Sequence, residues 1–186
     1  DAVGVSPVSG PARAARAVRA GIDHDRAFGA VVPPLVLSSN FSFEGFNRKR
    51  RYDYTRSGNP TRDQFGAALA DLEGGHDAVV TSTGMSAIAL VLQLLAPGDT
   101  VLAAHDCYGG SWRLFDALAR KQHFRLRLVD MTDAAAFDAA LAAEKPKLVW
   151  IETPSNPLLR ITDLQRSCAA AGGRGNASSR PCRTSR

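Results

Sequence analysis

Residues 81–88 form the stretch of this chain whose residue types best suit the binding of a phosphate group. The sequence there is Thr-Ser-Thr-Gly-Met-Ser-Ala-Ile, between the apolar run 78–80 and a helical pattern that begins at Ile88. A turn from a strand into a helix leaves the first helical amides without internal partners, and glycine lets a ligand approach the backbone. The stretch therefore predicts either a phosphate cradle or a simple helix cap built from hydroxyl side chains.

Tyr54 and Arg56 are a second pair with binding chemistry. On an extended chain, residues two apart point to the same side, so this phenol and guanidinium can hydrogen-bond one phosphate together. The alternative is a surface tyrosine and arginine that share no ligand. The basic run 48–51 before them indicates either a solvated loop or part of an anion site.

Two further polar stretches, 105–113 and 152–157, each follow a predicted strand. Tyr108 precedes two glycines, so its ring face is available to a flat ligand or packs on its own domain. Asn156 stands in a proline-rich loop, where its amide contacts a ligand or only takes part in a turn. Both residues are candidates for a site at the ends of the strands.

The cysteines and histidines do not predict a metal site. His105 and Cys107 are near neighbours, but no third ligand lies close to them in the sequence. With Cys168 and Cys182 the cysteine count is odd and lacks C-x-x-C spacing, which argues against zinc and against a disulfide framework. This usage fits a reducing, cytoplasmic compartment.

The elements that must position these residues alternate between helix and strand from residue 61 onward. Hydrophobic periodicity, bounded by Gly and Pro, predicts helices near 61–72, from Gly84, near 111–121 and near 133–143, and strands near 78–82, 100–104, 124–129 and 147–152. Such alternation without hairpin signals indicates an α/β fold: a mostly parallel sheet with helices on both faces. Ligands are then expected at the carboxyl ends of the strands.

The first sixty residues have a different character. Arg13, Arg16 and Arg19 recur at helical spacing in an Ala-rich stretch, which predicts an exposed N-terminal helix. Residues 21–60 follow no helical or strand period, and so long a segment more often wraps around something, such as a neighbouring subunit. We expect residues 1–62 to form an N-terminal arm and inter-subunit segment.

The charge of the chain excludes one class of partner. The net charge is +5, but residues 166–186 contribute five arginines and no acid, and the remainder has 18 basic and 18 acidic residues. A neutral body gives no electrostatic case for nucleic acid. No apolar run reaches membrane-spanning length, so neither nucleic acid nor membrane is expected as a partner.

Six motifs together resemble one family, the Cys/Met-metabolism enzymes dependent on pyridoxal phosphate. The resemblance covers residues 17 to about 164. In chain order the motifs are A-V-R-A-G at 17–21, Y-D-Y-T-R-S-G-N-P-T at 52–61, L-E-G-G at 72–75, S-T-G-M-S-A at 82–87, D-C-Y-G-G at 106–110 and E-T-P-S-N-P at 152–157. The resemblance implies the aspartate-aminotransferase-like (type I) transferase fold, of which this chain carries an incomplete part.

The resemblance also implies roles for single residues at the cofactor phosphate and ring. Gly84 and Met85, through their amides, and Thr83 hold the phosphate of pyridoxal 5′-phosphate. Tyr54 and Arg56 reach across to the phosphate bound by a neighbouring subunit.

For the ring and the substrate, four residues are implied. Tyr108 stacks on the pyridine ring and acts in the acid and base steps. Asn156 lies beside the phenolic oxygen of the ring and the substrate carboxylate. Asp53 and Arg113 face the substrate.

The reaction implied by the resemblance is a trans-sulfuration in methionine biosynthesis. Cysteine replaces the γ-substituent of an O-acylhomoserine, here O-succinylhomoserine, to give cystathionine. The alternative is a lyase that cleaves cystathionine on its γ or β side, because these relatives share the motifs. The expected assembly is a homotetramer, built as a dimer of dimers.

The resemblance stops near residue 165. A family member continues to a D-N-T-F strand end, whose Asp pairs with the pyridine nitrogen, and to an S-x-T-K segment with the Schiff-base lysine. Residues 166–186 instead form a tail rich in Arg, Ser and Gly, which we expect to be mobile or non-native. We therefore expect residues 63–165 to be the N-terminal part of the cofactor-binding domain, and a catalytically inactive fragment is the second hypothesis.

Overall fold

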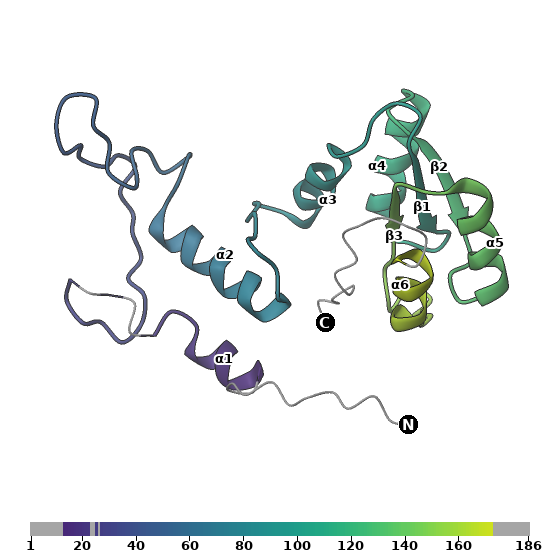
Figure 1. Ribbon diagram of the computed structural model, residues 1–186, viewed down its shortest axis with the longest axis horizontal. Helices are drawn as coiled ribbons and strands as arrows, with labels where there is room; N and C mark the ends of the chain where they lie inside the picture. The colour runs from purple at the N-terminus through teal and green to yellow at the C-terminus, as the bar shows by residue number, and fades with distance from the viewer. Residues whose placement is uncertain (1–12, 23–24, 26, 173–186) are drawn as a thin grey trace. The chain divides into compact units, whose positions relative to one another are not determined.

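A computed structural model describes residues 13–22, 25 and 27–172 of the chain (Figure 1). The chain divides into two compact units, Asp1–Val80 and Thr81–Arg186, and each is described by itself. The three-part division predicted from the sequence, with boundaries at residues 62 and 165, stays a prediction.

The described part of unit 1 contains two helices, α1 (Arg13–Arg19) and α2 (Pro60–Glu73). The Asn59 side chain caps α2 by accepting a hydrogen bond from the Thr61 amide at 2.9 Å, and Pro60 supplies a preset first turn. The helix ends at Gly74, whose left-handed φ of 63° suits a residue without a side chain. Both predicted helices are confirmed.

The segment between these helices has no regular element among its described residues. Only two isolated bridges occur there, Asn40 with Tyr54 and Gly45 with Arg48. Asn59 holds the segment against the start of α2, because its side-chain amide donates to the Val36 carbonyl at 3.1 Å and to the Thr55 hydroxyl. The irregular character predicted for residues 21–60 is confirmed.

Unit 2 is built on a parallel sheet of β1 (Thr100–Ala104), β2 (Arg125–Val129) and β3 (Leu148–Trp150), in the order β2-β1-β3. In register, Thr100 lies opposite Arg125 on one side of β1, and Val101 lies opposite Leu148 on the other. The central strand β1 is buried along its whole length, whereas β2 alternates between exposed and covered residues. The predicted parallel α/β architecture is confirmed.

Among the described residues of unit 2, four helices accompany the sheet. They are α3 (Gly84–Leu92), α4 (Gly109–Arg120), α5 (Ala134–Glu144) and α6 (Leu164–Gly172). Since β1 connects to β2 through α4 and β2 returns past β1 to β3 through α5, right-handed crossovers put α4 and α5 on opposite faces, as Figure 1 shows. Phe115 of α4 and Phe137 of α5 are fully buried in the core of this unit.

The strand predicted near residues 78–82 is wrong. These residues form no strand, and Val79 is 75% exposed. A strand exists only where its backbone groups pair with a neighbour, and residues 78–82 pair with none of the three described strands. An apolar run alone does not reveal whether a partner strand is present.

The tail prediction is wrong for its first residues. Residues 166–172 belong to α6, and Arg166 donates a hydrogen bond to Asp138 of α5 at 2.6 Å. The rest of the predicted tail, 173–186, lies outside the described residues.

The two described cysteines differ. Cys107 is free and buried, whereas Cys168 of α6 is disulfide-bonded, which departs from the reduced thiols that the cysteine count suggested. Within the part of the chain that the structure describes, no helix combines the length and apolarity needed to cross a membrane.

Candidate functional site

The start of α3 is the hydroxyl-capped helix start that the sequence predicted, and the phosphate cradle stays a prediction. Thr83 is the N-cap, and its hydroxyl accepts the Ser86 amide at 3.0 Å while its carbonyl accepts the Ala87 amide at 3.1 Å. The amides of Gly84 and Met85 make no hydrogen bond to any described residue. Two donors at the positive end of a helix therefore remain available to an anion.

The sheet order locates a second part of the site. The chain winds from β1 to β2 in one direction and then back to β3 in the other, so the winding reverses between β1 and β3. Open parallel sheets bind ligands at such a reversal, outside the carboxyl ends of the strands. Tyr108 follows β1 and Asn156 follows β3, so both predicted residues come from the loops at this position.

Tyr108 lies beside the start of α3. Its ring is half exposed, and a side-chain carbon added at Gly110 would collide with that ring and lie 3.1 Å from the Met85 sulfur. Gly110 therefore allows the Tyr108 ring and Met85 to share one small volume. The structure brings together three of the predicted residues: Gly84, Met85 and Tyr108.

Glu152 is a functional candidate that the sequence argument missed. Its carboxylate accepts hydrogen bonds from the Tyr108 amide at 2.6 Å, the Ser111 hydroxyl at 2.7 Å and the Trp150 indole N–H at 2.8 Å. The sequence feature that points to Glu152 is its place directly after an apolar strand, because a charged side chain next to a buried strand needs hydrogen-bond partners.

The loop that carries Asn156 is fixed by its neighbours. The Ser155 hydroxyl accepts the Arg160 amide at 3.1 Å, and the Ser155 amide donates to the Arg160 carbonyl at 3.0 Å. The Arg160 guanidinium in turn donates to Asp130, after β2, at 2.6 Å and lies 3.9 Å from Asp106, after β1. Asn156 itself is exposed, so its amide is free to meet a ligand.

Tyr54 and Arg56 lie together in unit 1, but not on an extended chain. Residues 55–57 form a turn, in which the Ser57 amide donates to the Tyr54 carbonyl at 3.1 Å. The Arg56 guanidinium lies over the Tyr54 ring, 4.8 Å from its centroid. The expected pairing is present, while the extended geometry assumed for it is wrong because the chain turns after Tyr54.

Of the two residues predicted to face the substrate, Arg113 is exposed and Asp53 is half exposed. Hydrogen bonds from the Ser57 hydroxyl and the Tyr54 amide lower the pKa of Asp53. This carboxylate therefore stabilises the local turn and is ionised at neutral pH. Arg113 lies in the first turn of α4, next to the loop of Tyr108.

His105 and Cys107 do not form a nucleophilic pair. Burial, followed by the charge of Glu152, raises the pKa of Cys107 to about 11, so this thiol is protonated at neutral pH. The His105 ring lies 3.2 Å from the Arg160 guanidinium, a position for a structural contact. Among the described residues, no group of His, Cys, Asp and Glu side chains could hold a metal ion.

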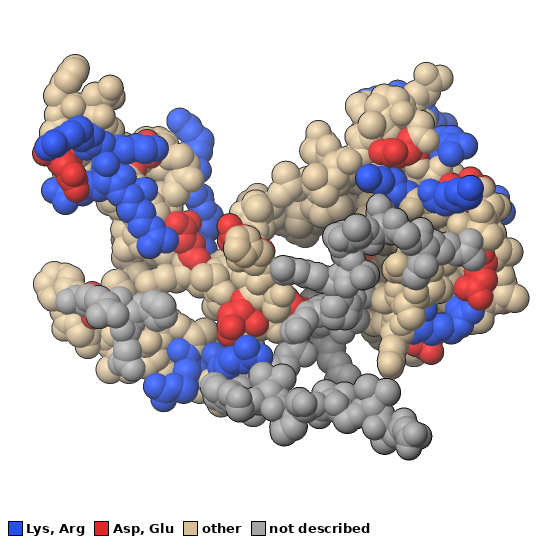
Figure 2. All heavy atoms as spheres, in the orientation of Figure 1, with Lys and Arg blue, Asp and Glu red and all other residues tan. Residues whose placement is uncertain are grey.

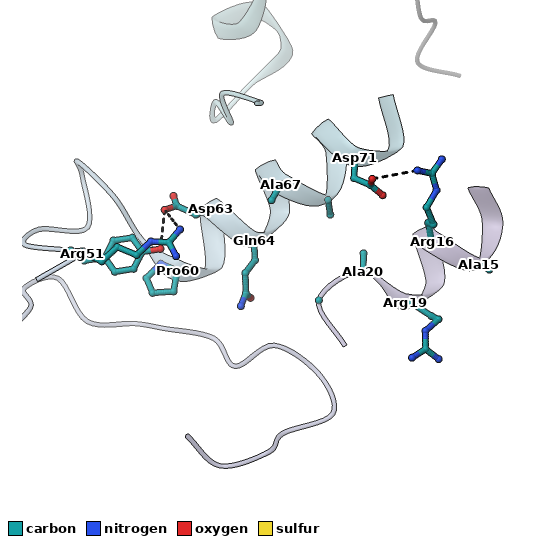
Figure 3. Close-up of a pocket in the computed structure, with 13 residues that line it drawn as sticks. Ala15, Arg16, Arg19, Ala20, Arg51, Pro60, Asp63, Gln64, Ala67 and Asp71 are labelled. Atoms are coloured by element: carbon teal, nitrogen blue, oxygen red, sulfur yellow. Dashed lines mark hydrogen bonds and ion pairs between the residues drawn. The ribbon is translucent and has the colours of Figure 1, made fainter. Parts of the chain in front are cut away.

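Unit 1 contains a cavity of about 680 Å³. It is bounded by α1, α2 and residues 51–52 (Figure 3). Arg16 pairs there with Asp71 at 3.3 Å, and Asp63 accepts the Tyr52 hydroxyl at 2.9 Å. No residue predicted to touch cofactor or substrate lines this cavity.

Charged side chains of both signs lie on the surface of unit 2. On the face of unit 2 seen in Figure 2, basic and acidic side chains lie side by side instead of forming a broad field of one sign.

Comparison with known proteins gives one consistent family. The model of the family described as "Cys/Met metabolism PLP-dependent enzyme" matches residues 14–177. The chain is 57% identical over 156 residues to cystathionine gamma-synthase of Escherichia coli, covering 83% of this chain and 40% of that protein. It is 39% identical to cystathionine beta-lyase of Lactococcus lactis subsp. cremoris, covering 84% and 41%.

Solved structures agree with these relatives. The chain is 64% identical to cystathionine gamma synthase from Xanthomonas oryzae pv. oryzae in complex with cystathionine, with a TM-score of 0.82. The match covers 89% of this chain and 43% of that one. The chain therefore spans about two fifths of the length of the relatives it matches.

Proposed function

Because the chain belongs to the Cys/Met metabolism PLP-dependent enzyme family, we propose that it supplies the phosphate cradle and ring contact for pyridoxal 5′-phosphate in a cystathionine gamma-synthase. The observation that carries the proposal is that the Met85 side chain and the Tyr108 ring lie against the same point beside Gly110, while the Gly84 and Met85 amides make no hydrogen bond to a described residue. Two helical N–H donors fit a phosphate, and a half-exposed phenol fits a flat ring.

The proposed reaction replaces the acyl group of O-succinylhomoserine by the thiol of cysteine, which gives cystathionine for methionine biosynthesis. The similarity to a cystathionine gamma synthase at 64% identity supports this choice over the beta-lyases at 39%. When bound, pyridoxal phosphate supplies the electron sink for the reaction. The residues of this chain bind and orient that cofactor.

Each site residue has a proposed task. Thr83 shapes the turn so that the first two helical amides face the phosphate, and Tyr108 covers one ring face and exchanges protons through its hydroxyl. Asn156 donates its amide to the phenolic oxygen of the ring. Asp53 and Arg113 bind the amino-acid substrate.

Tyr54 and Arg56 have a proposed task in a different subunit. The Arg56 guanidinium and the Tyr54 hydroxyl contact the phosphate held by a neighbouring copy of the protein. This assignment requires at least a dimer, and we propose a homotetramer built as a dimer of dimers in the cytoplasm.

The cradle is tested by removing one amide without changing the helix. Gly84→Pro deletes the N–H at the first helical position, where proline is well tolerated, and Thr83 is already in the extended conformation that precedes proline. We expect this variant to bind pyridoxamine 5′-phosphate about tenfold more weakly, since it loses a hydrogen bond to a charged group. Isothermal titration measures the affinity, and pyridoxamine phosphate needs no lysine.

Gly84→Ala is the matched control. Nothing lies within 4 Å of the side-chain carbon added there, and the amide is kept. We expect this variant to bind like the unaltered chain. Equal affinity in the proline variant would contradict the cradle.

The reaction itself is tested on a longer chain that also carries the lysine of the family. That protein should release succinate from O-succinylhomoserine only when pyridoxal phosphate is present, and it should form cystathionine when cysteine is supplied as well. Release of 2-oxobutanoate or pyruvate from cystathionine at a higher rate would favour a gamma-lyase or beta-lyase. Lack of turnover by the 186-residue chain alone would agree with the second hypothesis, an inactive fragment.

A further inference from the structure

The carboxylate of Glu152 connects the two loops of the candidate site. Its Oε2 atom accepts the backbone amide of Tyr108, and its Oε1 atom accepts Ser111 and Trp150. All three donors lie between 2.6 and 2.8 Å, the range of charge-assisted hydrogen bonds. Tyr108 and Glu152 are 44 residues apart, so this contact joins the loop after β1 to the end of β3.

The groups around Glu152 are held by the core of unit 2. Ser111 is fully buried in the first turn of α4, and the Trp150 ring packs edge-on against the buried Phe115, with centroids 5.7 Å apart. The Glu152 carboxylate is therefore hydrogen-bonded to one residue of α4 and one residue of β3, and both residues are packed in the core. These hydrogen bonds link the end of β3 to the start of α4.

Tyr108 has few other restraints. It is the N-cap residue of α4, but its side chain makes no capping hydrogen bond. Gly110 leaves room for its ring without fixing it. The Glu152 carboxylate accepts the amide of this N-cap residue, and an acid at the start of a helix also interacts favourably with the helix dipole.

We infer that Glu152 is a positioning residue that holds Tyr108, through its backbone amide, in the place where its ring covers the cofactor. This inference rests on the proposed function. Glu152 acts on the ring contact and leaves the phosphate contacts alone, because its bonds go to α4 and β3 and not to α3. Losing it should therefore weaken binding of the ring but not of phosphate.

The test compares two ligands on the full 186-residue chain. In Glu152→Ala we expect the affinity for pyridoxamine 5′-phosphate to fall about tenfold, as for a lost hydrogen bond to a charged group, while the affinity for inorganic phosphate is unchanged. Hydrogen exchange of the Tyr108 amide should be about tenfold faster, with protection of β1 unaltered.

A double variant provides a rescue. The two carboxylate oxygens of Glu152 accept N–H groups from Tyr108 and Trp150, whereas a glutamine has one carbonyl oxygen and one NH₂ group. In either orientation of the amide, its NH₂ group would face one of these N–H groups, so Glu152→Gln alone cannot keep both hydrogen bonds. In Glu152→Gln with Trp150→Phe, the carbonyl can accept from Tyr108 while the NH₂ group donates to the Ser111 hydroxyl. We expect this pair to recover both Tyr108 protection and pyridoxamine phosphate affinity.

Glu144→Ala is the control, because Glu144 is an acid of the same unit whose recorded ion pair, with Arg127, is 4.0 Å long. It should behave like the unaltered chain in both measurements. Equal loss of both ligands in Glu152→Ala, or loss of protection throughout β1, would show a general structural role and overturn the inference. Unchanged Tyr108 exchange would overturn it as well.

If the proposed function is wrong, the unaltered chain binds pyridoxamine phosphate no better than inorganic phosphate. The exchange rate of the Tyr108 amide in Glu152→Ala would then still decide whether Glu152 holds Tyr108.

Discussion

Cys107 and Tyr108 are neighbours in the chain with opposite surroundings. The Cys107 side chain is buried against the core, while the Tyr108 ring is half exposed at the strand end. The sequence alone placed both in a polar loop, and it could not distinguish them because burial depends on elements far away. Local chemistry was easier to predict: the Thr83 cap and the Gly84 helix start depend only on residues within one turn.

The contact of Glu152 with Tyr108 marks the limit of sequence reasoning at this scale. Each residue could be singled out by its type and by the strand before it, but their pairing depends on the strand order. The strand order β2-β1-β3 cannot be deduced from the sequence alone.

Cys107 should be nearly inert to alkylation in the folded chain. Its pKa of about 11 leaves far less thiolate at pH 8 than an ordinary thiol has, and the side chain is buried. We expect iodoacetamide to modify Cys107 more than about a hundredfold more slowly in buffer than in urea. Peptide mass mapping over time measures both rates, and similar rates would contradict this environment.

At the scale of elements, the strands and helices of unit 2 were predicted to within about two residues at most ends. Their apolar runs are short and are bounded by turn residues such as those at 97–99, which fix the limits of each element. The error at 78–82 has the same origin, since an equally apolar run there has no strand beside it. Periodicity reports which residues prefer burial, and pairing requires a second segment.

Arg160 connects three strand ends, and its main partner predicts an acid response. The Thr132 hydroxyl and the Arg160 guanidinium hold the pKa of Asp130 below its ordinary value. The unfolded chain therefore takes up this proton more readily, so the stability that the carboxylate provides is complete above about pH 4 and is lost as the pH falls further.

Asp130→Asn should remove that contribution. We expect the free energy of unfolding at pH 7 to fall by about 1 kcal/mol, because the pair is partly exposed and screened, and the decline below pH 4 to become shallower. Urea titrations at a series of pH values measure both. Asp116→Asn, which breaks an ion pair within one helix, is the control. If the free energy of unfolding of Asp130→Asn fell below pH 4 as steeply as that of the unaltered chain, the argument would be refuted.

At the scale of the whole molecule, the described residues expose more large apolar side chains than a stable surface tolerates. Phe28, Leu37 and Phe46 of unit 1 are almost fully exposed, and Leu94 of unit 2 is largely so. Exposed large apolar side chains favour association in water. The structure identifies the residues that are exposed.

We therefore expect the purified 186-residue chain to associate or to be poorly soluble. Sedimentation velocity over a concentration series should show species larger than a monomer. Replacing Leu37 and Phe46 by serine should shift the distribution toward the monomer, whereas replacing the exposed Arg50 by serine should not. A monodisperse monomer for the unaltered chain at every concentration would contradict this expectation.

Because β1, β2 and β3 run parallel, the turns that precede the strands and the loops that follow them lie at opposite ends of the sheet. The turns from α4 to β2, at 121–124, and from α5 to β3, at 145–147, lie at the amino ends of the strands, on the edge of the sheet opposite Tyr108 and Glu152. An insertion or deletion in either turn would lengthen or shorten the chain without moving these two residues apart. Related proteins are thus free to differ at that edge, while the loops after β1 and β3 must keep their lengths.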